Sequence, residues 1–166
     1  LKVVIKIFKQ NNLKVVSPKK LSTKLFFNEK KISSEISKND KNDIDKSVNI
    51  LNDLSKYDIA QSIVCINGYI IGIEAAEGTD SLLKRTFKIR DELGQLNMKA
   101  GLLTKIPKKN QSLLVDLPVI GPKTVNMVKK ANLNGIAINK NLTMVENKTK
   151  TLELLKTNQL CLYDLS

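Results

Sequence analysis

The sequence predicts an α/β domain, built as a mixed sheet with flanking helices. Short apolar runs of strand length alternate with segments of helical periodicity along most of the chain. Two of these runs are joined by Asn67-Gly68, the dipeptide that a type I′ hairpin turn favours. Gly121-Pro122 places a proline in the first turn of a following helical segment. With 166 residues, the chain has room for one ordinary domain with a proper core.

The chain begins at Leu1 rather than at Met, and we expect it to be a piece of a longer protein. Leu1–Gln10 fits either a helix or a strand, because its apolar residues suit both patterns. Leu13–Val16 fits a short strand that Ser17-Pro18 ends. Asn28–Asn42 is rich in Lys, Ser, Asn and Asp and has few apolar anchors, which favours a flexible linker.

The middle of the chain predicts a helix followed by a hairpin. Apolar residues at helical spacing behind an aspartate predict an amphipathic helix over Asp43–Tyr57. The strands of the hairpin are Ile63–Ile66 and Tyr69–Ile73, on either side of the Asn-Gly turn.

A second helix is predicted over Ser81–Leu93, with Gly94 closing it. Thr79 or Asp80 is its natural N-cap, because short oxygen side chains accept from the free N–H groups of a first helical turn. The same alternation of strands and helices continues beyond it. The later predicted strands are Gly101–Ile106, Leu113–Val115, Gly135–Ile138, Leu142–Val145 and Leu160–Tyr163, and the later helices are Pro122–Lys130 and Lys148–Thr157.

The composition excludes several classes of chemistry. There is no histidine, which removes Ser-His-Asp triads and histidine-ligated metals, so catalysis would need carboxylates, lysines and a metal. The net charge of +12 suggests nucleic-acid binding, but all except two of the 28 basic residues are lysine, not the arginine most used for base readout. Aromatic residues make up 4% of the chain, too few for a base-stacking platform.

Three carboxylates lie where the hairpin meets the second helix, in Glu74-Ala-Ala-Glu77-Gly-Thr-Asp80. Carboxylate oxygens suit magnesium, and the free N–H groups of a helix start suit a phosphate. The stretch therefore indicates phosphate chemistry. The alternative is an ordinary capped helix surrounded by solvated acids.

A second constellation begins with Lys105 and Gln111 and continues through Asp116 to Thr124. Asp116 is predicted at the end of a short strand, just before the helix that Gly-Pro opens. In α/β folds, ligands gather where strand ends meet helix starts. An ordinary turn aspartate in Asp-Leu-Pro accounts for the local pattern equally well.

Several motifs occur together and in a fixed order. They are Asp58-Ile-x-Gln61, Glu74-Ala-x-Glu77-Gly78-Thr79-Asp80 with Arg85, Lys105, Gln111, Asp116-x-Pro118-x-Ile120-Gly121-Pro122-x-Thr124 and Gly135-Ile-Ala-Ile. In this order they resemble the C-terminal domain of the magnesium-dependent UDP-2,3-diacylglucosamine pyrophosphatases of bacterial lipid A synthesis, the type unrelated to metallophosphoesterases. The resemblance covers residues 43–166, a C-terminal α/β domain. Residues 1–27 resemble the end of the family's N-terminal domain, with residues 28–42 as the linker.

The resemblance implies hydrolysis of the pyrophosphate of UDP-2,3-diacylglucosamine to 2,3-diacylglucosamine 1-phosphate and UMP, with Mg²⁺ as cofactor. It implies that Asp116 binds the metal or orients the water, with Glu77 and Asp80 as further metal or water ligands. The residues expected to hold the substrate, directly or through a neighbour, are Gly78, Thr79, Arg85, Lys105, Gln111, Gln61 and Thr124.

The resemblance also implies a cytoplasmic protein, free or peripheral at the inner membrane, whose substrate is a lipid nucleotide at that surface. It is compatible with a homodimer and gives no reason to expect a specific nucleic-acid partner. The chain departs from the family pattern at Ser112 and Leu114, where an acid and an arginine are usual. These departures leave open a non-catalytic relative that binds a nucleotide-sugar lipid or a protein partner. The net charge leaves open a second alternative, a lysine-rich nucleic-acid-binding module.

Overall fold

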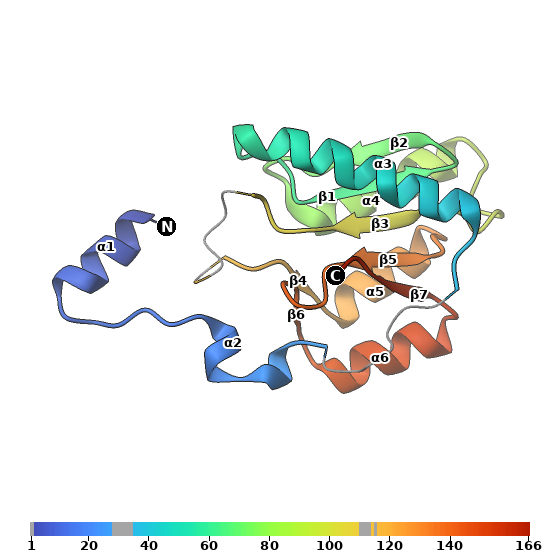
Figure 1. The fold of residues 1–166 in the computed structure, drawn as a ribbon. Coiled ribbons are helices and arrows are strands. Elements are labelled where there is room, and N and C mark those ends of the chain that lie inside the picture. Colours follow the sequence, from blue (N-terminus) through green and yellow to red (C-terminus); the bar gives the residue numbers. More distant parts are fainter. Residues whose placement is uncertain (1, 28–34, 110–113, 115) are drawn as a thin grey trace.

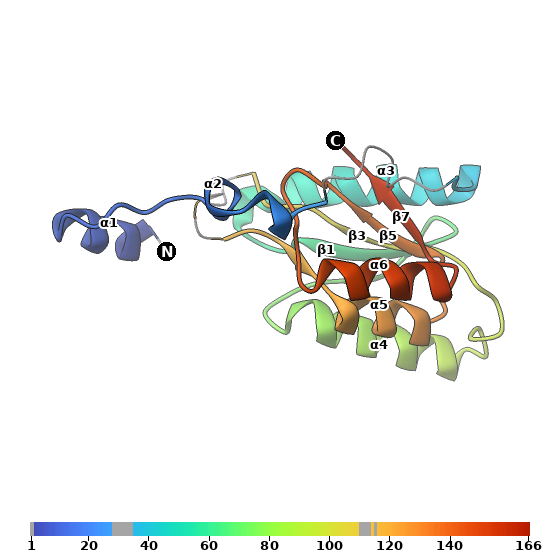
Figure 2. The same cartoon turned by 90° about the horizontal axis from the view of Figure 1, so that it is seen from below.

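The computed structural model describes residues 2–27, 35–109, 114 and 116–166. Within them a five-stranded sheet is covered by one helix on one face and three on the other (Figures 1 and 2). The α/β class predicted from the sequence is therefore confirmed. The strands are β1 (Ser62–Ile66), β2 (Tyr69–Ile73), β3 (Leu102–Lys105), β5 (Gly135–Ile138) and β7 (Cys161–Asp164), and the covering helices are α3 (Lys38–Leu54), α4 (Gly78–Glu92), α5 (Pro122–Lys130) and α6 (Lys148–Thr157).

The strand order β2-β1-β3-β5-β7 brings distant segments to one edge of the sheet. β3, β5 and β7 run parallel, whereas β1 is antiparallel to both β2 and β3. The start of β1 and the end of β2 therefore lie beside the carboxyl ends of the three parallel strands, along one edge of the sheet that runs across the ends of all five strands. We call this the Lys105 edge; its residues are Ser62, Ile73, Lys105, Ile138 and Asp164.

The sheet separates two apolar layers. The larger core lies between the sheet and α4, α5 and α6, where Leu82, Val125 and Leu155 meet alternate residues of the strands. The smaller core lies on the other face of the sheet, where Leu51 and Ile44 of α3 pack against the strands. Because side chains alternate along a strand, each strand contributes to both layers.

The predicted hairpin is confirmed, and a buried carboxylate fastens its turn to α3. Asn67 and Gly68 both have positive φ, 49° and 83°, as a type I′ turn requires. Their N–H groups donate to the carboxylate of Asp43 at 2.7 and 2.6 Å, and the thiol of Cys65 donates to the same group at 3.3 Å. α3 begins at Lys38, five residues earlier than predicted, so residues 38–42 are helical and not linker.

The N-terminal part extends away from the sheet (Figure 1). α1 (Lys2–Gln10) is a helix, one of the two predicted alternatives, and short helical turns follow at α2 (Pro18–Leu21) and η1 (Thr23–Leu25). The strand predicted at Leu13–Val16 is wrong, because this segment has no neighbouring strand with which to pair among the described residues. Phe26 and Phe27 are buried and join this part to the domain.

Other boundaries differ from the sequence prediction. α4 begins at Gly78, three residues before the predicted Ser81, while its end before Gly94 is confirmed. The strand predicted at Leu113–Val115 falls partly outside the described residues, and Leu114 lies in a turn. A small parallel pair, β4 (Val119–Ile120) with β6 (Met144–Val145), precedes α5 and α6. A further short turn, η2 (Ser55–Tyr57), follows α3. Across the described ranges, no helix is both long and apolar enough to cross a membrane.

Candidate functional site

Two helix starts lie beside the Lys105 edge. α4 starts five residues after β2 ends at this edge, and α5 starts one residue after β4. An ion pair of 2.5 Å between Asp80 of α4 and Lys123 of α5 joins these first turns. The two helices run side by side beneath the sheet (Figure 2). Helix starts carry free N–H groups and a partial positive charge, so the pair favours an anion.

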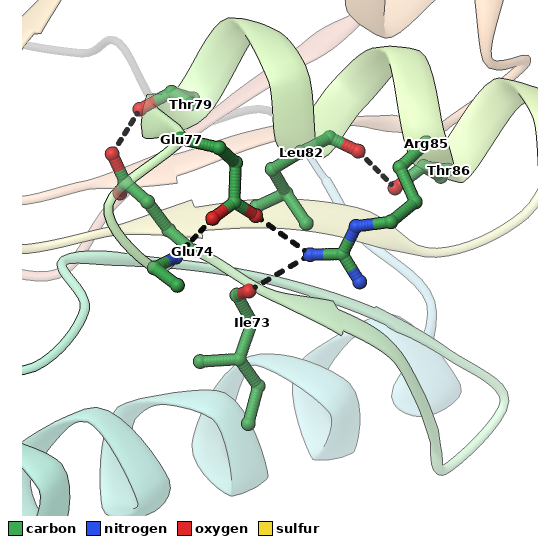
Figure 3. A network of polar contacts seen from close by, with 8 residues as sticks. Ile73, Glu74, Glu77, Thr79, Leu82, Arg85 and Thr86 are labelled. Atoms are coloured by element: carbon green, nitrogen blue, oxygen red, sulfur yellow. Dashed lines mark hydrogen bonds and ion pairs between the residues drawn. The ribbon is translucent and has the colours of Figure 1, made fainter.

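A buried chain of polar groups connects the edge to the start of α4. The ammonium of Lys105 donates to Thr79 Oγ1 at 2.7 Å, and Thr79 donates to Glu74 Oε1 at 3.1 Å. The hydroxyl of Ser62 lies 3.2 Å from the same threonine oxygen. Figure 3 shows Glu74 and Thr79 facing each other across the loop between β2 and α4. Three elements, β1, β3 and α4, therefore meet at one threonine.

Lys105 is a buried cation in this chain, with a side chain only 6% exposed. Burial lowers its pKa below the usual lysine value, and the negative charges of Glu74 and Asp80 oppose that shift. Its single hydrogen bond uses one of three N–H donors, and no carboxylate lies within ion-pair distance among the described residues. The other two donors are thus available to a bound anion.

Glu77 clamps the loop to the second turn of α4 (Figure 3). Its Oε1 pairs with Arg85 at 2.8 Å, and its Oε2 accepts from the N–H of Ala75 at 3.1 Å. The same Arg85 nitrogen donates to the carbonyl of Ile73 at 3.0 Å. The pKa of Glu77 is lowered, first by its own backbone N–H and then by Arg85. Both carboxylate oxygens thus have partners in the loop and helix.

Two glycines allow close approaches around the site. A Cβ on Gly72 would lie 2.6 Å from Leu82 Cδ1, so β2 and α4 could not pack as closely with any other residue. A Cβ on Gly121 would lie 2.7 Å from Glu146 Oε2, which places that carboxylate against the start of α5. The close contact with Glu146 therefore explains why the Ile-Gly-Pro motif has glycine at this position.

The structure places most predicted site residues at the Lys105 edge or in the adjoining helix starts. Gly78, Thr79 and Asp80 form the first turn of α4, with Arg85 in the next turns, and Thr124 lies buried in the first turn of α5. Neither Thr79 nor Asp80 is the N-cap, since Glu77 occupies that position without a side-chain cap bond. Gln61 directly precedes β1, and its buried Oε1 has no partner in the part of the chain that is described.

Asp116 and Gln111 belong to the long connection between β3 and β4. Gln111 falls outside the described residues, so its predicted role stays a prediction. Asp116 is half-buried before β4, and its carboxylate makes no hydrogen bond or ion pair with the described residues. It therefore keeps its full capacity to bind a cation or a water molecule.

A magnesium ion would find few preformed protein ligands here. Nowhere in the described ranges do three or more Cys, Asp or Glu side chains gather closely enough to hold a metal ion. Magnesium is commonly held by one or two carboxylates together with substrate phosphates. Of the three predicted ligands, Glu77 has partners for both oxygens, Asp80 pairs with the exposed Lys123, and Asp116 has no partner among the described residues.

The site also contains residues that the sequence did not single out. Ser62 belongs to the polar chain only because strand register sets it opposite Lys105. Lys123 lies inside the Gly-Pro-Lys-Thr block, so its nearness to the motif was a usable signal. Glu74 was predicted only as one of three carboxylates suited to magnesium, without a role of its own in the site, and it is the buried acid of that stretch.

Comparisons with known proteins give a consistent result. Residues 29–163 match the family model described as the LpxI C-terminal domain. A relative from Caulobacter vibrioides, named UDP-2,3-diacylglucosamine pyrophosphatase LpxI, is 37% identical over 95 residues. That alignment covers 57% of this chain and 34% of the relative, so the chain matches about a third of that protein's length.

Proposed function

Since this chain belongs to the LpxI C-terminal domain family, we propose that it takes part in hydrolysis of the pyrophosphate of UDP-2,3-diacylglucosamine. The products would be 2,3-diacylglucosamine 1-phosphate and UMP, and the protein would be a hydrolase of lipid A biosynthesis. The activity for which the Caulobacter relative is named supports this substrate. The chain's own residues support the class of chemistry.

The observation that carries the proposal is a buried lysine beside two helix starts. A pyrophosphate has two adjacent anionic groups, and the Lys105 edge offers two adjacent groups of N–H donors, in the first turns of α4 and α5. Lys105 adds a positive charge with two free donors between the sheet and α4. Such fixed donors stabilise phosphate charge more strongly in a partly buried site than in water.

In the proposed reaction, a water molecule attacks one phosphorus atom and the bond from that phosphorus to the bridging oxygen breaks. The N–H groups of Thr79, Asp80 and Ser81 would hold one phosphate, and those at the start of α5 would hold the other. Asp116 would accept a hydrogen bond from the attacking water and orient it. Mg²⁺ bound by Asp116 and Asp80 would neutralise phosphate charge.

Arg85 and Thr124, two further predicted residues, would assist in different ways. Arg85 donates one nitrogen to Glu77 and Ile73, so it would reach the substrate with its other guanidinium N–H groups. Thr124 would stabilise the first turn of α5.

We further propose that the protein meets its lipid substrate at the cytoplasmic surface of the inner membrane, as a monomer or a homodimer.

A second candidate function is binding without hydrolysis. Leu114, at a position where the family resemblance expects an arginine, is 39% exposed and offers no charge. A substrate site that lacks this cation would hold the phosphates less firmly in the transition state. The chain would then act as a receptor for the lipid nucleotide.

The test is a hydrolysis assay of the complete protein on UDP-2,3-diacylglucosamine, with UMP release measured in magnesium and in EDTA. We expect release in magnesium and its loss in EDTA. Saturable binding of the lipid nucleotide without UMP release would favour the receptor function. Absence of both binding and release would refute the assignment of this substrate.

A further inference from the structure

Glu74 is the buried member of the acidic stretch. Its side chain is 6% exposed, whereas Glu77 lies at the surface and has partners for both oxygens. Glu74 Oε1 accepts from Thr79, and Oε2 is buried without a partner among the described residues. A buried carboxylate with one unpaired oxygen is costly, so its presence calls for a reason beyond solvation or capping.

The direction of the polar chain follows from its chemistry. A carboxylate only accepts hydrogen bonds, so the single hydroxyl proton of Thr79 must go to Glu74. Thr79 Oγ1 must then accept from Lys105, because an ammonium only donates, and the Ser62 hydroxyl is left to donate as well. Glu74 thus fixes the orientation of Thr79, and Thr79 fixes the position of the Lys105 ammonium.

Thr79 also keeps the two charges apart. Lys105 and Glu74 share the threonine but do not form an ion pair within 4.0 Å. A direct pair would neutralise the ammonium and use more of its N–H donors. With the hydroxyl between them, one of the three Lys105 N–H donors is used and two have no partner among the described residues.

We propose that Glu74 is a positioning residue that acts through Thr79 to aim the Lys105 ammonium at a phosphate oxygen of the bound anion. This assignment rests on the proposed function only for the identity of the anion. Anion binding itself is tested without the lipid substrate. Glu74 touches no substrate atom in this arrangement.

Two simpler roles for Glu74 lead to different results. If Glu74 acts only as a nearby negative charge, its removal strengthens anion binding, because repulsion is relieved. If Glu74 only ties the loop to α4, its removal lowers thermal stability and leaves anion affinity unchanged. The positioning role predicts weaker binding, with the sign opposite to simple electrostatics.

The probe is inorganic pyrophosphate, titrated into the full chain by isothermal titration calorimetry without added metal. Glu74→Met keeps the length of the side chain but removes the acceptor, and Thr79→Val keeps the shape of threonine but removes the hydroxyl. We expect each to weaken binding about tenfold, which is typical when a hydrogen bond to a charged group is lost. The conservative variants Glu74→Gln and Thr79→Ser keep an acceptor and a hydroxyl, and should stay within about threefold of wild type.

The double variant Glu74→Met with Thr79→Val should lose no more than either single variant, because both act through one chain of hydrogen bonds. Asp91→Asn, exposed on α4, is the matched control and should bind as wild type does. Unchanged or tighter binding by Glu74→Met and Thr79→Val overturns the proposal, as does full additivity in the double variant. If one single variant does not fold, the other and its conservative partner decide the question.

The same variants in the UMP-release assay separate this proposal from the proposed function. If the variants bind pyrophosphate more weakly while the wild-type protein hydrolyses no lipid nucleotide, the positioning role is supported and the proposed reaction is refuted. Normal pyrophosphate binding in Glu74→Met, with wild-type hydrolysis intact, would refute the positioning role alone.

Discussion

Arg90 should be among the most sensitive positions for stability, and Arg90→Met tests this. The residue is 1% exposed near the end of α4, and its guanidinium meets no carboxylate within the described part of the chain. It donates instead to four carbonyls: Ala131 at 2.6 Å, Asn132 at 2.8 Å, Gln95 at 2.9 Å, and Met98. These carbonyls belong to the end of α5 and to the loop after α4. One side chain of α4 therefore joins two backbone segments, the loop after its own helix and the end of α5.

The expected loss is smaller than the sum of four bonds. Each hydrogen bond to a charged group contributes about 1.5–3 kcal/mol, but loop carbonyls can regain water and the desolvation cost of the charge disappears. We therefore expect Arg90→Met to lower the free energy of unfolding by about 4 kcal/mol. For a domain of this size, that corresponds to a fall in Tm of roughly 8–16 °C.

The assay is urea denaturation followed by circular dichroism, with calorimetry for Tm. Lys88→Met on the same helix is the control, because its ion pair with Glu92, at 3.8 Å, is exposed and should contribute under about 1 kcal/mol. Arg90→Lys keeps the charge but loses the forked donors, so its loss should be intermediate. A loss below about 1 kcal/mol for Arg90→Met would show that the four carbonyls do not depend on the guanidinium, and would refute this reasoning.

Four further predictions concern the site and the surface. Asp116→Ala should lower UMP release at least about a hundredfold while substrate still binds and the fold stays intact, with Asp91→Ala as control; near-normal turnover would exclude Asp116 as the water-orienting acid. Pyrophosphate affinity, measured by calorimetry, should fall as pH rises through the lowered pKa of Lys105, which lies below the ordinary lysine value of 10.5. An affinity that stays constant up to pH 10.5 would contradict this prediction. Because the folded pKa lies below the unfolded one, this lysine disfavours folding at neutral pH, and the cost is relieved as pH rises between the two values. Gly72→Ala should destabilise the fold by about 1–3 kcal/mol in urea, since its Cβ would lie 2.6 Å from Leu82 Cδ1, and a gain in stability would disprove the clash. Binding to DNA or RNA in gel-shift assays should be weak and lost as salt rises, whereas tight sequence-specific binding at physiological salt would favour the nucleic-acid alternative.

Local signals predicted the elements whose shape depends on local residues. The Asn-Gly turn needs positive φ at both positions, so the hairpin followed directly from Asn67 and Gly68. The start of α5 followed from Pro122, and α6 matches its predicted range of Lys148–Thr157. In each case the residues that determine the element lie within it.

The missed features depend on partners that are distant in sequence. Thr79 or Asp80 was predicted as the N-cap, but the hydroxyl of Thr79 binds Lys105, 26 residues away, and the carboxylate of Asp80 pairs with Lys123. α3 starts early because Ser37 caps Asp40, and Asp40 is buried against Asn134 across the domain. A polar composition suggested a linker there, since sequence alone cannot show that a polar residue has a buried partner.

The motifs predicted which residues belong to the site better than they predicted what each residue does. Gly78–Asp80 and Lys105 come together because β2 ends and β3 ends at one edge, which the α/β pattern made plausible. The contrast between Glu74 and Glu77 could not be predicted, because two glutamates three residues apart look alike until the loop is folded. Only the structure distinguishes the buried acid from the surface clamp.

The environment of the two cysteines has a practical consequence for spectroscopy. Burial raises the pKa of Cys65 to about 12 and that of Cys161 to about 11, and the carboxylates of Asp43 and Asp40 add to the respective shifts. Thiolate is the form that reacts with maleimides and peroxides, so both thiols should stay unlabelled and reduced at neutral pH. A cysteine introduced at an exposed position such as Asp91 could then carry a fluorophore or spin label in the otherwise native sequence.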